Sequence, residues 1–297
     1  MTIHALSFDV ENWYDGSLHR DAFQGPQDGR VVPETERVLE VLGGAGVRGT
    51  FFILGRVARQ HPQLVRRVAE AGHEVACHGY DHVQLFRLSP ATLLSDLRFA
   101  RATLQDLSGQ PVLGFRAPTW SIDARNLHWA PAVIAEAGFS YDSSIFPLRT
   151  PFYGLHQAPV TPWQHVLEGG RQLVEFPPAV AAFGPLRIPF GGGIYWRLLP
   201  ERIIAWLLRR STAPEVIYLH PWELNPEHVP VGNGISWVAR GVLTVGVRRG
   251  HQPLQRLMSQ FQFGPIGEVF AREISTGVRL WPGLQGCSGA RRRRSPT

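Results

Sequence analysis

The chain has 297 residues, a length that fits one large α/β domain or two small ones, and its 44% hydrophobic and 18% charged residues are typical of a folded globular protein. Four of its six net positive charges come from the run Arg291 to Arg294, so the body of the chain is nearly neutral and we expect no nucleic-acid partner. All 30 basic residues are arginine, which excludes a lysine Schiff base, a pyridoxal cofactor and a lysine-containing phosphate loop.

Short apolar segments alternate with helical patterns from the start of the chain, as in repeated βα units around a parallel sheet. The first strand is predicted over Ile3 to Asp9. A helix is predicted to begin at Pro33 and to be ended by Gly43 and Gly44. The second strand is predicted over Thr50 to Leu54.

The next helix is predicted to begin at Pro62 and to end before Gly72, and a strand follows over Glu74 to Cys77. Ser89, with a proline after it, has the features of a cap for a long helix whose apolar period continues to Gly109. Four further strands are expected, over Leu113 to Phe115, Phe139 to Tyr141, Leu173 to Phe176 and Val216 to Leu219.

This alternation suits either an open doubly wound sheet or a (β/α) barrel. The glycine-rich phosphate fingerprint of a dinucleotide fold is missing after the first strand, where Asp9, Val10 and Glu11 stand instead, and this favours the barrel. No repeat or linker divides the chain. We therefore expect a single domain over residues 1–282, followed by a disordered arginine-rich tail at 283–297.

The cysteines and the start of the chain bear on its compartment. Cys77 and Cys287 are far apart in the sequence and encode neither a disulfide framework nor a zinc ribbon. No signal-peptide pattern precedes the first strand and no 18-residue apolar run follows, which predicts a cytoplasmic protein without a membrane span. The basic tail leaves peripheral membrane association as an alternative, and the oligomeric state stays open.

Polar side chains stand at the carboxyl ends of the predicted strands, where active sites of parallel α/β proteins collect. Asp9 and Glu11 are two positions apart, so both can point the same way. His78 follows a strand directly and His82 is four residues further on, a spacing that lets two imidazoles converge on one metal ion. With one carboxylate they would form a His-His-carboxylate site with an open position.

Three more polar residues end predicted strands: Arg116, Asp142 and His220. Each alone is compatible with an ordinary surface residue. Polar residues thus occur at five strand ends while the strand interiors stay apolar, and packing gives no reason for this distribution. It favours one shared active site.

Five short segments carry these residues and span most of the chain: Ser7-Phe8-Asp9-Val10-Glu11, His78-Gly79-Tyr80-Asp81-His82, Arg116-Ala117-Pro118, Tyr141-Asp142-Ser143-Ser144 and Leu219-His220-Pro221-Trp222. In these segments and their order the chain resembles the polysaccharide deacetylase family, with its NodB-homology domain and its carbohydrate esterase family 4-like members. The Asp-Val-Glu start, the Leu-His-Pro-Trp-Glu segment and Phe261-Gln262-Phe263 resemble the subgroup associated with exosortase and exopolysaccharide loci.

The resemblance implies a distorted or incomplete (β/α) barrel and an enzyme that hydrolyses N-acetyl groups on an amino-sugar polymer or oligosaccharide in exopolysaccharide biosynthesis, releasing acetate. It implies that Glu11, His78 and His82 hold a divalent metal ion, most often Zn²⁺, with Co²⁺ or Ni²⁺ as alternatives. Asp9 would be the general base and His220 the general acid. The polymer and the preferred chain length stay open.

The resemblance also implies orienting partners, with Arg116 holding Asp9 and Asp142 holding His220. The chain departs from the family pattern at Glu11, where many relatives have aspartate. It departs again at Thr119, which replaces the aromatic residue that follows Arg-x-Pro.

Aromatic residues near the motifs, namely Trp120, Tyr195 and Trp222, are candidates for stacking on sugar rings, although aromatic side chains belong more often to the core. The run Gly191 to Gly193 is interpreted as a mobile lid or a turn. Two rival functions remain. One is a metal-free, allantoinase-like hydrolase of small amides, and the other is an inactive sugar-binding module, which would be expected to lack Asp9 or His220.

Overall fold

The computed structural model describes residues 2–16, 29–228 and 236–281, so the predicted tail at 283–297 lies outside the described residues. Its main sheet contains β1 (Ile3–Val10), β2 (Thr50–Ile53), β3 (Glu74–Cys77), β4 (Gly114–Phe115), β5 (Tyr141–Asp142), β6 (Trp163–His165), β7 (Val174–Glu175), β10 (Val216–Leu219), β11 (Gln262–Gly264) and β12 (Leu280–Trp281). A separate hairpin is formed by β8 (Val180–Phe183) and β9 (Leu186–Pro189).

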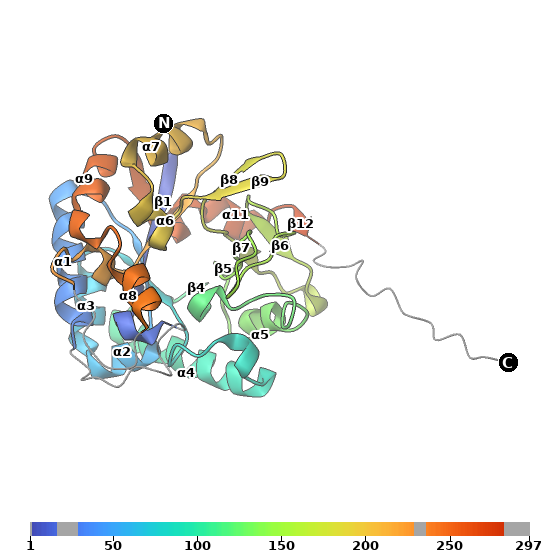
Figure 1. Cartoon of the computed structure of the whole chain (residues 1–297). Coiled ribbons are helices and arrows are strands. Elements are labelled where there is room, and N and C mark those ends of the chain that lie inside the picture. The colour runs from blue at the N-terminus through green and yellow to red at the C-terminus, as the bar shows by residue number, and fades with distance from the viewer. Residues whose placement is uncertain (1, 17–28, 229–235, 282–297) are drawn as a thin grey trace.

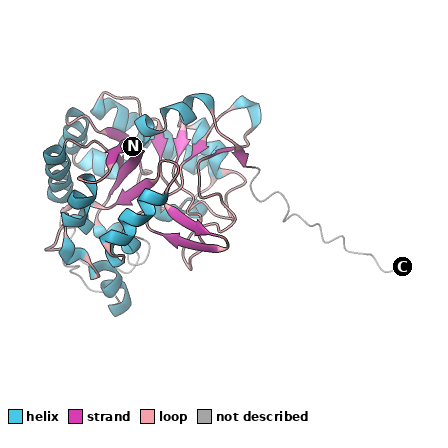
Figure 2. Ribbon diagram, turned by 90° about the horizontal axis from the view of Figure 1, so that it is seen from above, coloured by secondary structure: helices cyan, strands magenta, loops and turns pink. Residues whose placement is uncertain are grey.

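The sheet has the order β10-β1-β2-β3-β4-β5-β7-β6-β12, with β11 pairing beside β1. Its pairs are parallel except β6 with β7, as expected where helices connect successive strands. The sheet curls into a half barrel (Figures 1 and 2), and two isolated parallel bridges join Pro178 to Val216 and Gly192 to Tyr218 of β10. The predicted incomplete barrel is therefore confirmed.

Helices surround the sheet: α1 (Val31–Ala45), α2 (Gly55–Gln60), α3 (Pro62–Glu70), α4 (Pro90–Ser108), α5 (Ala130–Glu136), α6 (Gly193–Leu198), α7 (Glu201–Arg210), α8 (Trp237–Thr244), α9 (Gln252–Met258), α10 (Ile266–Val269) and α11 (Ala271–Thr276). On the outside, α5, α4, α3, α1, α9 and α7 pack in that order, each on the next (Figure 1). No helix in the described part of the chain is long and apolar enough to cross a membrane.

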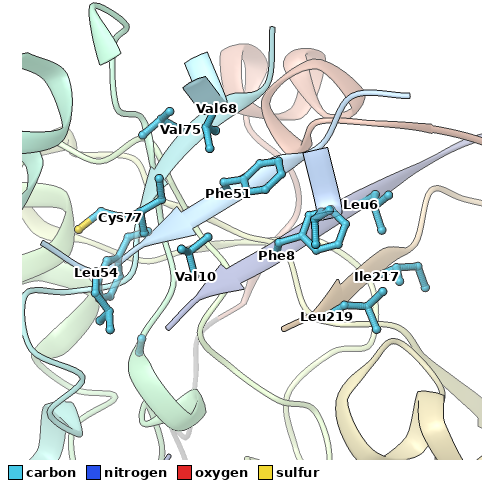
Figure 3. Packing of buried hydrophobic residues seen from close by; sticks show 14 of the residues in the cluster. Leu6, Phe8, Val10, Phe51, Leu54, Val68, Val75, Cys77, Ile217 and Leu219 are labelled. Carbon is cyan, nitrogen blue, oxygen red and sulfur yellow. The ribbon is translucent and has the colours of Figure 1, made fainter. Parts of the chain in front are cut away.

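Side-chain alternation along the strands separates an outer core from the barrel interior. In β1, Leu6, Phe8 and Val10 join the helices in one large apolar cluster (Figure 3), whereas Ala5 belongs to a second cluster inside the barrel. Because successive side chains of a strand point to opposite faces, Asp9 shares the inward direction of Ala5.

Strands β3 and β10 repeat this alternation. Ala76 and Val216 belong to the inner cluster, and His78 and His220 stand at the same parity, two and four residues later. The outward residues of these strands, Val75, Cys77, Ile217 and Leu219, pack against the helices (Figure 3). The apolar pattern that builds the outer core therefore also turns three polar side chains toward one place.

Most predicted elements are observed, but α1 begins at Val31 rather than at Pro33, and two further boundaries differ. The strands over Glu74 to Cys77 and Val216 to Leu219 are observed, and Ser89 caps α4 by accepting the N–H of Thr92 at 3.1 Å. Helix α1, however, continues through Gly43 and Gly44 and ends at a left-handed Gly46. The predicted strand at Phe139 to Tyr141 is displaced, and β5 is Tyr141–Asp142.

Candidate active site

A cavity of about 180 Å³ opens at the carboxyl ends of β1, β3 and β10. Its wall contains the predicted ligands and acid-base groups Asp9, Glu11, His78, His82 and His220. All but His220, which is partly exposed, are buried. The structure thus brings together residues that are more than 200 positions apart in the sequence.

Glu11, His78 and His82 place one ligating atom each around a common point. Glu11 Oε2 lies 3.2 Å from His78 Nε2 and 2.6 Å from His82 Nε2, and the three ligating atoms lie within 4.8 Å of one another. Two imidazole nitrogens and one carboxylate oxygen are donors suited to Zn²⁺ and related ions. The donor set and its convergence fit the divalent metal ion that the sequence predicts.

The ligands are held by the chain around them. His78 Nδ1 lies 2.9 Å from the carbonyl oxygen of Arg116, which fixes the ring and directs Nε2 toward Glu11. Three non-glycine residues adopt left-handed backbone angles within the described ranges: His82 at φ 49°, Thr119 at 56° and Trp120 at 51°. All three line this cavity, and such backbone strain concentrates at functional sites.

Arg116 pairs with Asp9, as the sequence predicts. Its Nη1 lies 2.6 Å from Asp9 Oδ1, and both side chains are buried. The guanidinium is itself held by Ser143, because Nε donates to the backbone oxygen at 3.2 Å and Nη2 to the hydroxyl at 3.1 Å. Its planar donors therefore tie Asp9 to the loop after β5.

His220 has a different partner from the predicted one. Its Nδ1 lies 2.9 Å from Glu223 Oε2, and Glu223 Oε1 in turn accepts from Arg197 Nε at 2.7 Å. Burial lowers the pKa of His220, but the nearby Glu223 carboxylate, with smaller effects of Glu11 and Asp9, raises it to about 9. The ring thus favours its protonated form near neutral pH.

Asp142 does not orient His220, and that expectation is wrong. Asp142 is fully buried outside the cavity, where its Oδ1 accepts from the Ser144 hydroxyl. The reason is parity: Tyr141 belongs to the inner cluster, so its neighbour Asp142 points to the outer face of the sheet. The Asp142 carboxylate is therefore turned away from the cavity that His220 lines.

Two of the three predicted aromatic residues line the cavity. Trp120 and Trp222 belong to its wall, but Tyr195 does not, and its ring stacks on Phe146 instead. The glycine run is neither a lid nor an open turn at Gly192, because that residue forms a parallel bridge with Tyr218 of β10. Trp13 also lines the cavity, and further apolar lining comes from residues that the sequence did not single out: Phe152, Ile194 and Leu243.

Sequence reasoning missed Glu223, Arg197 and the two serines after Asp142. Glu223 stands three residues after His220 within the Leu-His-Pro-Trp-Glu segment, so its spacing was a usable signal. Arg197 lies 26 residues before its partner, and no local pattern points to it.

Two family models match adjoining parts of the chain. The model described as polysaccharide deacetylase matches residues 24–139, which carry the predicted ligands His78 and His82 and also Arg116. A model described as a domain of unknown function (DUF3473) matches residues 143–271, which carry His220 and Glu223.

Relatives and solved structures agree with the first match. A peptidoglycan-N-acetylglucosamine deacetylase of Bacillus cereus is 29% identical over 37% of this chain and 43% of its own length. A chitooligosaccharide deacetylase of Rhizobium leguminosarum is 30% identical over 37% of this chain and 61% of its own length. The chain therefore spans less than two thirds of these relatives.

The crystal structure of a Mycobacterium smegmatis protein assigned as a polysaccharide deacetylase has a TM-score of 0.59 at 20% identity, covering 95% of this chain and 92% of that one. At this identity the likeness shows the fold. The chain is therefore similar to polysaccharide deacetylases over residues 24–139, and the structural neighbour shares its fold.

Proposed function

We propose that the protein is a metal-dependent hydrolase that removes acetyl groups from an N-acetylated amino-sugar polymer or oligosaccharide. The observation that carries the proposal is that Asp9, Glu11, His78, His82 and His220 face one cavity. The relatives reported above are named as deacetylases of peptidoglycan N-acetylglucosamine and of chitooligosaccharides, which supports this substrate class. The proposal includes Zn²⁺ as the metal ion and exopolysaccharide biosynthesis as the process in which the enzyme acts.

Glu11, His78 and His82 would hold the metal ion. When bound, a divalent ion supplies a Lewis acid that polarises a carbonyl and makes water a better nucleophile. One carboxylate oxygen of Asp9 forms the ion pair with Arg116, and the other oxygen accepts the proton of the attacking water. The Arg116 contact fixes the direction in which this carboxylate faces the substrate.

His220 acts on the leaving group. As water adds to the acetamide carbon, the carbon-nitrogen bond breaks and Nε2 of His220 gives its proton to the departing amine, so acetate and a free amino sugar are produced. Glu223 holds the ring by Nδ1, which leaves Nε2 directed into the cavity. Trp120 and Trp222 supply flat apolar surfaces of the kind on which sugar rings stack.

Two observations count against the rival functions. A metal-free hydrolase has no chemical need for three convergent ligands, and Glu11, His78 and His82 converge. An inactive binding module has no need for an acid and a base at one cavity, and Asp9 and His220 both line it.

The test is acetate release from chitooligosaccharides, peptidoglycan fragments and poly-N-acetylglucosamine by the purified chain, after chelation and after reloading with Zn²⁺. Chelation should abolish release and Zn²⁺ should restore it. Asp9→Asn and His220→Ala should keep their metal content but lose roughly 10²–10⁴-fold in turnover. His128→Ala, a change at an exposed histidine away from the cavity, is the control. Full activity of the chelated protein, or of either variant, would contradict the proposal.

A further inference from the structure

A second group of three buried ligating side chains lies apart from the cavity, on the outer face of the sheet. Asp142 of β5 is paired across the strands with Glu175 of β7, so their side chains share a face, and His165 comes from β6. One ligating atom of each lies within 4.8 Å of the others. His165 Nε2 is 3.4 Å from Glu175 Oε2.

Both carboxylates are held by their other oxygen. Glu175 Oε1 accepts the backbone N–H groups of Ser144 and Ile145, each at 2.8 Å, and Asp142 Oδ1 accepts from the Ser144 hydroxyl. Asp142 Oδ2, in contrast, is buried and has no hydrogen-bond partner. Ligands that are fixed from behind while one atom of each stays available are typical of metal sites.

The charges of this group are unbalanced. Asp142 and Glu175 are fully buried, and in the described chain no arginine forms an ion pair with either. Burial lowers the pKa of His165 to about 4, so its ring is neutral and keeps a lone pair for a ligand. Burial and the facing Glu175 carboxylate raise the pKa of Asp142 well above its usual range. A cation or a proton must therefore accompany the pair.

We propose that Asp142, His165 and Glu175 bind a second divalent cation, which has a structural role. Two ligand atoms on a tetrahedral ion such as Zn²⁺ lie roughly 3.3–3.5 Å apart. The 3.4 Å between His165 and Glu175 fits this separation, and it is longer than an ordinary N–H···O hydrogen bond. A proton shared by the two carboxyl groups would engage the imidazole only through its long contact with Glu175, whereas a cation uses all three side chains as ligands.

The cation would link β5, β6 and β7 next to the loop that follows β5 and contains Ser143 and Ser144. Ser143, next to Asp142 in this loop, holds Arg116, and the Ser144 hydroxyl accepts the N–H of Ala117 at 2.7 Å. A bound ion at the outer face would therefore stabilise the segment that positions the Asp9 partner. Binding of this second ion is independent of the reaction proposed above.

The test is the number of ions per chain, measured by mass spectrometry after loading with Zn²⁺ or Mn²⁺ and dialysis. In the double variant His78→Ala/His82→Ala, whose first site is removed, one ion per chain should remain, and chelation should lower its melting temperature. Adding Asp142→Asn, which keeps the shape of the side chain, should remove that ion. Glu74→Gln, a change in a half-buried carboxylate held by Thr50 and Tyr141, is the matched control and should keep it.

Anomalous diffraction from crystals of the wild-type chain grown with Zn²⁺ tests the second site without any substitution. An anomalous peak is expected between Asp142, His165 and Glu175, about 2.0–2.2 Å from their ligating atoms. A double variant that binds no ion, or crystals with a peak only beside Glu11, would overturn the proposal and leave a shared proton as the counter-charge.

Discussion

Glu223 Oε2 lies 2.9 Å from Nδ1 of His220. Glu223 therefore orients this ring, the role that the sequence analysis expects of Asp142. The carboxylate raises the pKa of the ring, although burial acts in the opposite direction. In Glu223→Gln that effect is lost and the pKa of His220 should fall. Because a general acid works in its protonated form, the alkaline limb of the pH–turnover profile should move to lower pH.

Asp142→Asn is the control for this prediction, since Asp142 points to the opposite face of the sheet. Its alkaline limb should stay where the wild-type limb is. A shift in Asp142→Asn and none in Glu223→Gln would restore the pairing expected from sequence.

Arg116→Lys should lower turnover by roughly 10²-fold, the cost of a small misplacement of a catalytic group. Lysine keeps the charge, but a single ammonium cannot reach Asp9 and both groups of Ser143 in the geometry of the guanidinium. Metal content should be unchanged, because the Arg116 backbone oxygen still holds His78. Steady-state kinetics with metal analysis check both. Arg101→Lys, at a side chain that donates to Val112 outside the cavity, should retain activity.

Gly192→Ala should destabilise the fold by roughly 1–3 kcal/mol, the range for inserting atoms into a packed interior. A Cβ at this position would lie 1.7 Å from the backbone oxygen of Tyr218, which cannot move without breaking its strand. Gly43→Ala makes the same chemical change in α1, where nothing lies within 4 Å of the new atom. That variant should gain about 0.5–1 kcal/mol. Urea denaturation of the two variants should give opposite signs, and equal shifts would be inconsistent with the packing.

Stability should fall as the pH drops from about 6.5 toward 4, in part through His73. Burial, and secondarily Arg48, lower the pKa of this ring to about 4, while its Nδ1 accepts the N–H of Gly49. Between about pH 6.5 and pH 4, His73 therefore binds a proton in the unfolded chain but stays neutral in the folded chain. His73→Asn keeps an acceptor but cannot be protonated, so its free energy of unfolding should decrease less between pH 7 and pH 5. The exposed-site control His128→Asn should lose as much stability as the wild type. An equal loss in His73→Asn would show that His73 does not cause the pH dependence.

The sequence by itself determined the alternation of the strands and the positions of the chemistry. Asp9, His78 and His220 stand at strand ends, at an even number of positions from residues of the same strand that face the barrel interior. This alternation of side chains between the two faces is a local property of the chain. Spacing alone therefore predicts that these side chains meet at one edge of a parallel sheet. The predicted metal ligands Glu11 and His82 line the same cavity.

Only the tertiary structure decided which groups pair with one another. Asp142 lies on the outer face of the sheet, and the face that a strand-end residue takes depends on strand boundaries that local propensity does not fix to one residue. Arg197, which holds Glu223, comes from a helix with no motif. The outer group of Asp142, His165 and Glu175 likewise exists because strand register, a long-range property, puts three separate segments side by side.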